Sequence, residues 1–233
     1  MYYAMSDLHG KYEKYIAMLE KINFSDEDTM FIIGDVVDRG EKPVEILLDM
    51  MKRPNVYPIM GNHEALALYI LKKLTVEITE ENSDSQINAE TMNELIDWIS
   101  DGGSPTISGF QKLKNSERLD LLDYISEFSM YEVTDVGERT FIMVHAGLGN
   151  FRKGKKLRDY TIEELIMTRN DFGTKYFDDD NIYVVTGHTP TLAITGKPQI
   201  YHKNNNICID CGASYESGKL ACLCLDNMKE YYV

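Results

Sequence analysis

A chain of 233 residues, 43% hydrophobic and 27% charged, has the composition of a folded globular protein that can bury a sizeable core. Its formal net charge of −14 argues against a nucleic acid or an anionic membrane as partner, because both select basic surfaces. Residues Met1 to Met5 lack the basic start and the apolar length of a secretory signal, and no segment approaches membrane-spanning length. We therefore expect a cytoplasmic protein with a single domain over residues 1–233.

The N-terminal third alternates apolar runs with amphipathic stripes. Strands are predicted over residues 2–6, 30–33 and 56–60, and helices over about 11–23, 43–51 and 65–74. This rhythm predicts an α/β fold with βαβ units and a largely parallel sheet. In such sheets, ligands bind outside the carboxyl ends of the strands.

The middle of the chain, from about Thr75 to Glu132, is more polar. Helical patches occur at Met92–Ile99 and Leu119–Phe128, and the stretch Asp101–Pro105 interrupts them. We interpret the segment of about 75–132 as a helical insertion over the edge of the sheet, where it could shape access to a site.

Strands are predicted again at Thr140–Val144 and Asn181–Thr186, and the tail from Gln199 to Val233 suggests short antiparallel strands. All four cysteines lie in this tail, with the spacings C-x-x-C and C-x-C. The spacing invites a structural zinc site, but the cysteines alternate within strand-like runs. We therefore interpret them as small buried thiols in a reducing compartment: Cys208, Cys211, Cys222 and Cys224.

Polar residues that bind metals in other proteins recur just after the predicted strands. Four of the five histidines occupy this position, together with two aspartates and an asparagine, and His202 does not. Imidazole mixed with carboxylate suits manganese, iron or zinc better than calcium or magnesium alone. There are enough ligands for two divalent ions, with Asp35 as the natural bridging carboxylate. The ligand candidates are Asp7, His9, Asp35, Asn62, His145 and His188.

These positions belong to five motifs that occur in order. The set resembles the motifs of calcineurin-like metallophosphoesterases, and more closely those of the bacterial and phage branch of the phosphoprotein phosphatase family. The resemblance implies a sandwich of mixed β-sheets flanked by helices. The motifs are Ser6-Asp7-Leu8-His9-Gly10, Gly34-Asp35-Val36-Val37-Asp38-Arg39-Gly40, Gly61-Asn62-His63-Glu64, His145-Ala146-Gly147 and Gly187-His188-Thr189, followed by Ile209-Asp210-Cys211-Gly212.

The resemblance also implies roles. Asp7 and His9 would bind a first metal, Asp35 would bridge, and the remaining ligand candidates would bind a second metal. Arg39 and, by a looser match, Arg169 would hold the phosphoryl oxygens. His63 would be the general acid, oriented by Asp38. Two positions depart from the family, since Ser6 and Ala146 stand where many members have glycine.

Together these features predict metal-dependent hydrolysis of phosphate monoesters by a water or hydroxide that bridges two ions, with manganese the first choice and iron or zinc as alternatives. We expect phosphoserine or phosphothreonine proteins as substrates. Small phosphoesters are an alternative substrate class. Dinucleoside polyphosphate hydrolysis is the alternative enzyme, although such relatives usually lack an aspartate at the position of Asp38. A non-catalytic scaffold that binds phosphorylated partners is a further alternative. The sequence does not indicate an oligomeric state.

Overall fold

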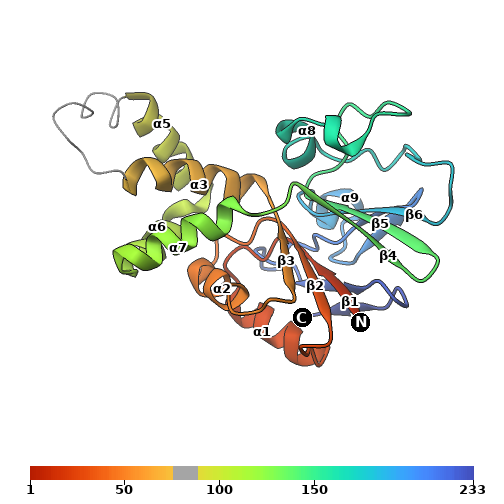
Figure 1. Ribbon diagram of the computed structural model, residues 1–233, viewed down its shortest axis with the longest axis horizontal. Helices are drawn as coiled ribbons and strands as arrows, with labels where there is room; N and C mark the ends of the chain where they lie inside the picture. The colour runs from red at the N-terminus through yellow and green to blue at the C-terminus, as the bar shows by residue number, and fades with distance from the viewer. Residues whose placement is uncertain (76–88) are drawn as a thin grey trace.

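Two five-stranded β-sheets lie at the centre of the molecule, with helices on their outer faces (Figure 1). The computed structural model describes residues 1–75 and 89–233. The predicted sandwich of mixed sheets flanked by helices is confirmed.

The first sheet has the strand order β10-β9-β1-β2-β3. Strands β1, β2 and β3 are parallel, as the βαβ pattern predicts, and the C-terminal strands β9 and β10 add an antiparallel edge. The bounds are Tyr2–Met5 (β1), Thr29–Ile33 (β2), Val56–Ile59 (β3), Ala221–Cys224 (β9) and Glu230–Tyr232 (β10).

The second sheet has the order β4-β5-β6-β8-β7. Its three central strands β5, β6 and β8 are parallel, and β4 and β7 pair with them in antiparallel fashion at the two edges. The bounds are Tyr131–Val136 (β4), Arg139–Val144 (β5), Ile182–Thr186 (β6), Tyr201–Lys203 (β7) and Asn206–Cys208 (β8).

Most of the helices cover the outer face of the first sheet. They are α1 (Tyr12–Lys21), α2 (Pro43–Met50), α3 (Asn62–Thr75), α5 (Ala89–Trp98), a π-helical turn (Ile99–Gly103), α6 (Ser104–Lys112) and α7 (Asn115–Ser126). The second sheet carries the 3₁₀ turn Leu157–Asp159 and α8 (Ile162–Ile166), and the short α9 (Thr191–Thr195) follows β6.

Strand β1 shows why the strand runs are apolar throughout. Tyr3 and Met5 pack with the helices on one face of the first sheet, while Ala4 packs on the other face against the second sheet. Because successive side chains point to opposite faces, a strand covered on both sides needs apolar residues at every position. Between the sheets, Phe141 of β5 is fully buried and its ring stacks on Tyr183 of β6 with centroids 5.5 Å apart.

The predicted helical patches of the insertion correspond to α5 and α7, but the sequence reading missed α6 and β4. The predicted insertion ends at Glu132, whereas Tyr131 already begins β4. Helix α6 packs against α2, and α7 packs against α3 (Figure 1). Residues 76–88 of the insertion lie outside the described part of the chain, and the single-domain boundary of 1–233 stays a prediction.

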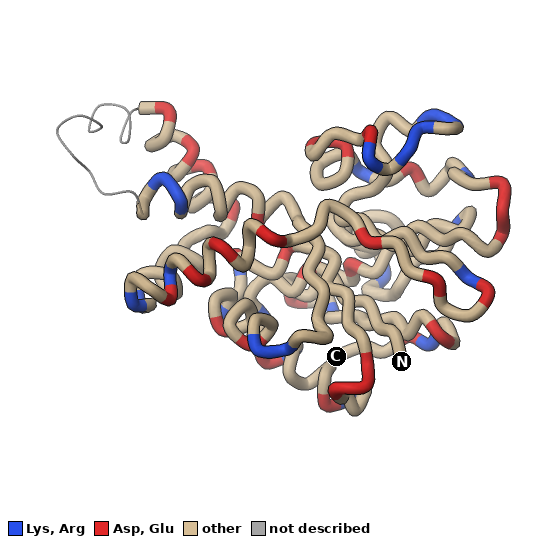
Figure 2. The backbone as a smooth tube through the Cα atoms, viewed as in Figure 1, with Lys and Arg blue, Asp and Glu red and all other residues tan. Residues whose placement is uncertain are grey.

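The four cysteines are buried and none forms a disulfide. Among the described residues, no helix is long and apolar enough to cross a lipid bilayer. Acidic positions occur over most of the molecule in Figure 2, and a dense group of basic positions lies in the loop before α8. That loop carries Arg152, Lys153, Lys155, Lys156 and Arg158.

Candidate binuclear metal site

The predicted site residues meet where the parallel strands of both sheets end. A cavity of about 210 Å³ lies at this edge, and eight of the ten predicted site residues line it. The other two, Asp38 and His145, are fully buried behind its wall. The lining residues that were predicted are Asp7, His9, Asp35, Arg39, Asn62, His63, Arg169 and His188.

The loops that carry these residues have unusual backbone conformations. Six site residues have positive φ angles between 41° and 69°. This left-handed region is uncommon for residues other than glycine, and such strain persists only where the surroundings enforce it. The six residues are Asp7, His9, Asp35, Asp38, Arg39 and His188.

Glu64 supplies much of that enforcement for the loop after β2. Its buried carboxylate accepts backbone N–H groups from Asp35 (2.7 Å), Val36 (2.7 Å), Val37 (3.0 Å) and Gly61 (3.1 Å). The loop would otherwise leave these N–H groups buried without partners. Glu64 therefore fixes the backbone of Asp35 from the neighbouring helix α3.

Asp35 is shared by two groups of candidate metal ligands. His9, Asp35 and His63 form one group, and Asp35, His145 and His188 form the other, each with ligand atoms within 4.8 Å of one another. A carboxylate between two such groups suits a bridging ligand.

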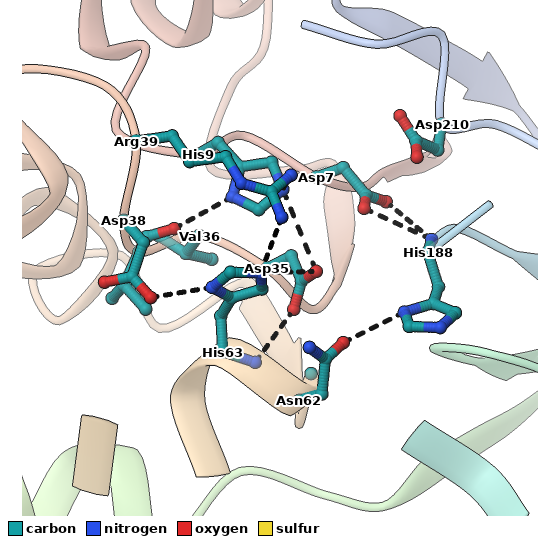
Figure 3. A network of polar contacts seen from close by, with 12 residues as sticks. Asp7, His9, Asp35, Val36, Asp38, Arg39, Asn62, His63, His188 and Asp210 are labelled. Atoms are coloured by element: carbon teal, nitrogen blue, oxygen red, sulfur yellow. Dashed lines mark hydrogen bonds and ion pairs between the residues drawn. The ribbon is translucent and has the colours of Figure 1, made fainter. Parts of the chain in front are cut away.

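Two further predicted ligands, Asn62 and Asp7, lie next to the second group (Figure 3). The side-chain oxygen of Asn62 is 3.0 Å from Nε2 of His145 and 2.9 Å from Nδ1 of His188. The carboxylate of Asp7 accepts the backbone N–H of His188 at 3.1 Å and 3.2 Å. Asn62 is therefore within ligand distance of the second group, and Asp7 lines the same cavity next to it.

The donor set fits a divalent transition metal. Nδ1 of His9 is 3.0 Å from the carbonyl oxygen of Val37, and Nδ1 of His145 is 2.9 Å from that of Ile33. A ring held in this way by a backbone carbonyl presents its other nitrogen, Nε2, to the site with a defined tautomer. Imidazole nitrogens together with carboxylate and amide oxygens match manganese, iron and zinc.

Buried negative charge is concentrated here. Burial is the main cause that raises the pKa of Asp7 well above its usual range, and the negative charge of Asp210 adds to the shift. Burial likewise raises the pKa of Glu64 and that of Asp210 to about 6. Burial, the largest single effect, lowers the pKa of His145, but the charge and hydrogen bond of Asp35 together with the charge of Asp7 outweigh it and raise that pKa to about 10. Cations would relieve this concentration of carboxylates.

His63 and Asp38 form a buried pair. Nδ1 of His63 is 2.7 Å from Oδ2 of Asp38. Burial opposes the charged imidazole, yet the hydrogen bond to Asp38 and the charge of Asp35 together raise the pKa of His63. Asp38 is itself held by the indole N–H of Trp98 at 2.8 Å and the hydroxyl of Thr106 at 2.6 Å. Both donors come from the helical insertion.

The two predicted phosphate-binding arginines approach the cavity from different sides. Arg39 lies beside the first ligand group, with Nη1 3.0 Å from Nε2 of His9 and Nη2 3.0 Å from Nε2 of His63. Arg169 follows α8 and lies near the second group. Burial is the main cause that lowers the pKa of His188, and the charge of Arg169 contributes to the same shift. Nη2 of Arg39 also donates to Asp101 on the π-helical turn at 3.3 Å.

Sequence reasoning assigned no role to several residues that the structure places at the site. Glu64 belongs to a quoted motif, and Asp210 lies in the tail motif after β8, so a signal existed for both. Asp101 belongs to the interruption in the insertion. Trp98 is the single tryptophan of the chain, but nothing local to it or to Thr106 indicates a partner as far away as Asp38.

A family model described as calcineurin-like phosphoesterase matches residues 2–223. The chain belongs to the calcineurin-like phosphoesterase family. The predicted resemblance is thereby confirmed at the level of the family. These enzymes are metal-dependent hydrolases of phosphoesters, so the predicted metal-dependent hydrolysis of a phosphoester is confirmed, without its substrate.

The chain is similar in sequence to a symmetrical bis(5'-nucleosyl)-tetraphosphatase from Wigglesworthia glossinidia brevipalpis. The two are 34% identical over 101 residues, which cover 42% of this chain and 37% of the relative. The corresponding protein of Proteus mirabilis is 28% identical over 99 residues, which cover 42% of this chain and 36% of that protein. The match thus spans just over a third of the length of these curated relatives.

Solved structures share the fold at low identity. A candidate diadenosine tetraphosphatase superposes with a TM-score of 0.67 and 17% identity, covering 100% of this chain and 92% of that one. A serine/threonine phosphatase from Saccharomyces cerevisiae superposes with a TM-score of 0.55 and 14% identity, covering 95% of this chain and 71% of that one. Both kinds of phosphatase therefore occur on this fold.

Proposed function

We propose that this calcineurin-like phosphoesterase hydrolyses dinucleoside tetraphosphates at a binuclear metal centre. The observation that carries the hydrolytic part is the position of Asp35 between two ligand groups in one cavity with two arginines. The similarity to symmetrical bis(5'-nucleosyl)-tetraphosphatases supports the substrate class in preference to the phosphoprotein substrate expected from the sequence.

The placement of the arginines is consistent with a substrate that carries several phosphates. A guanidinium group binds phosphate oxygens through paired N–H donors. Arg39 and Arg169 lie beside different ligand groups of the same cavity, so that they can hold neighbouring phosphates of one chain.

We assign one metal ion to His9 and Asp35, with Asp7 in the same cavity, and the other to Asp35, His145, His188 and Asn62. His63 lies within reach of the first ion but is assigned as the proton donor and not as a ligand. When bound, two divalent ions supply a nucleophile that is ionised near neutral pH and neutralise charge on the phosphoryl group. The protein orients the imidazoles of His9 and His145 through backbone carbonyls, and Glu64 fixes the backbone of the bridging carboxylate. Asp38 binds Nδ1 of His63, which leaves Nε2 as the atom that would carry a proton to the leaving oxygen once Arg39, now 3.0 Å from Nε2, turns to the phosphate.

The test compares two substrates on one preparation. Protein stripped with a chelator and reconstituted with Mn²⁺ is given diadenosine tetraphosphate, and separately a phosphoserine or phosphothreonine peptide. We expect rapid conversion of the tetraphosphate to ADP, resolved by ion-exchange chromatography. Peptide turnover without nucleotide cleavage would overturn the proposed substrate class and leave a metal-dependent phosphatase.

A second candidate function is phosphoprotein dephosphorylation, and the buried His63–Asp38 pair favours it. The alkoxide released from a serine or threonine ester is strongly basic and requires a proton, whereas a released nucleoside diphosphate is weakly basic. A general acid typically contributes about 10²–10⁴-fold, and its contribution falls as the leaving group becomes less basic.

The variant His63→Asn separates the two substrates. It should lower kcat on a phosphoserine peptide by about 10²–10⁴-fold while metal content is unchanged. On diadenosine tetraphosphate we expect a much smaller loss. An equal loss on both substrates would contradict the role of His63 as a leaving-group acid. Two bound metals with turnover of neither substrate would favour the scaffold alternative.

A further inference from the structure

A second hollow adjoins the candidate metal cavity. This hollow, here called the α9 groove, has a volume of about 400 Å³. Three of its lining residues, Arg169, Pro190 and Tyr215, also line the metal cavity, so the two spaces are neighbours. Its other lining residues are Leu192, Ala193 and Ser217.

Tyr215 is the aromatic residue at the junction. Its exposed fraction is 49%. Among the large exposed apolar side chains of the described residues, Tyr215 alone borders the metal cavity. An aromatic ring that is half exposed at a substrate cavity offers a flat apolar surface for another ring.

The loop that carries Tyr215 is fixed from two directions. The N–H of Tyr215 donates to the carbonyl of Gly212 at 2.9 Å, and the N–H of Gly218 donates to the carbonyl of Tyr215 at 3.1 Å. From helix α1, the ammonium group of Lys14 donates to the carbonyls of Ala213 (3.0 Å) and Gly218 (3.3 Å). The loop therefore needs little further ordering when a ligand binds.

Gly212 keeps the groove open beneath the ring. It has a φ of +75°, and a Cβ built there would lie 2.9 Å from Cδ1 of Leu192 and 2.9 Å from Cδ2 of Tyr215. The two side chains therefore border the same glycine, and a larger residue would push them apart. The groove wall thus depends on glycine both for its backbone angle and for its space.

We propose that the α9 groove binds the nucleobase of the substrate, with the base stacked on Tyr215 and Arg169 holding the adjacent phosphate. This inference rests on the proposed function for the identity of the ligand. A planar base matches a groove lined by one aromatic ring and the aliphatic residues Leu192 and Ala193, and Ser217 adds a polar residue to the lining. Because Arg169 and Tyr215 line both spaces, the phosphates that the ribose of this nucleoside carries can reach the metal cavity.

The test uses Tyr215→Ala, with Tyr215→Phe as the variant that keeps the ring. The matched control is Tyr57→Ala, because Tyr57 is 47% exposed but lies on β3 and lines neither space. Each protein is loaded with Mn²⁺, and its KM is measured for diadenosine tetraphosphate and for inorganic tripolyphosphate, which has no base. The Kd of ADP is measured separately by calorimetry.

For Tyr215→Ala we expect KM for the nucleotide and Kd for ADP to rise by about ten- to a hundredfold, the range that stacking on an aromatic side chain supplies. KM for tripolyphosphate should change by less than about twofold, and Tyr215→Phe and Tyr57→Ala should behave as the unmodified protein. Equal losses on nucleotide and tripolyphosphate, or unchanged binding of ADP, would overturn the stacking site.

Failure of the proposed function gives a different pattern. If the unmodified protein does not cleave diadenosine tetraphosphate but binds ADP in a manner that depends on Tyr215, the base site stands and the substrate proposal fails. If cleavage is rapid and the Kd of ADP is the same in Tyr215→Ala as in the unmodified protein, the substrate proposal stands and the base site fails.

Discussion

Replacing Glu64 with glutamine tests whether this carboxylate holds the loop that carries Asp35. Each carboxylate oxygen accepts two backbone N–H groups, at distances of 2.7–3.1 Å, and the side chain is fully buried. In Glu64→Gln one oxygen becomes an NH₂ group, so two of these N–H groups face another donor. A buried unsatisfied N–H costs about 1–3 kcal/mol, which gives about 2–6 kcal/mol for two.

That loss is large against a total stability of about 5–15 kcal/mol. For a chain of this size it corresponds to a fall in Tm of about 4–24 °C, at about 2–4 °C per kcal/mol. Unfolding should be followed in urea both with a chelator and with excess Mn²⁺, because metal bound to the folded state adds to the apparent stability.

The control is Glu45→Gln, the same chemical change at an exposed position of α2. It should alter the free energy of unfolding by less than about 0.5 kcal/mol. If Glu64→Gln were equally mild in the presence of chelator, the four N–H contacts would not be holding the loop, and the argument would fail.

Three other changes separate metal binding, proton donation and core packing. Asp35→Ala should abolish metal binding, because both ligand groups lose their shared carboxylate. Metal content is measured by elemental analysis after dialysis, and retention of two ions would show that Asp35 is not the bridging ligand. Trp98→Phe deletes one hydrogen-bond donor to Asp38 and should lower kcat on a phosphoserine peptide by about ten- to a hundredfold, while the metal content stays the same. An unchanged kcat would mean that Thr106 alone positions Asp38. Phe141→Ala should cost about 3–5 kcal/mol in urea unfolding, since the ring is fully buried between the sheets; a smaller loss would indicate that the sheets close over the cavity.

Local sequence patterns were sufficient to locate the strands that end at the site. Strands β1 and β2 are buried on both faces, so their sequences are short continuous apolar runs, and the polar residue that follows marks the point where burial ends. The buried apolar run recurs at the ends of β5 and β6, and β3, although Tyr57 is exposed, is also an apolar run followed by a polar motif. The ligand candidates could therefore be placed at one edge of the sheets from the sequence.

Elements without such a pattern were missed. Strand β4 lies at a sheet edge with two exposed residues and one buried residue, and its sequence continues the polar character of the insertion. Helix α6 begins within the stretch Asp101–Pro105, whose glycines and proline indicate a break. In the structure Gly102 has a φ of 105° and Pro105 lies in the first turn of α6, where its missing N–H is harmless. The same residues therefore begin a helix after a short π-helical turn.

The partners of Asp38 show a limit of a different kind. Trp98 and Thr106 are 60 and 68 residues away along the chain. Neither has a neighbouring residue type that signals its contact, since a tryptophan or a threonine in a helix is ordinary. Only the packing of the insertion against α2 and α3 brings them to the loop after β2.

These contacts make the described part of the insertion from residue 98 onward a structural support of the site. The N–H of Arg39 donates to the carbonyl of Gly102 at 2.9 Å, and Trp98 and Thr106 hold Asp38 from the same segment. A cover that opened by moving this segment would break all three contacts and release both Asp38 and Arg39. Access to the metal cavity is therefore better explained by the side that this segment does not hold, where the α9 groove adjoins the cavity at Arg169.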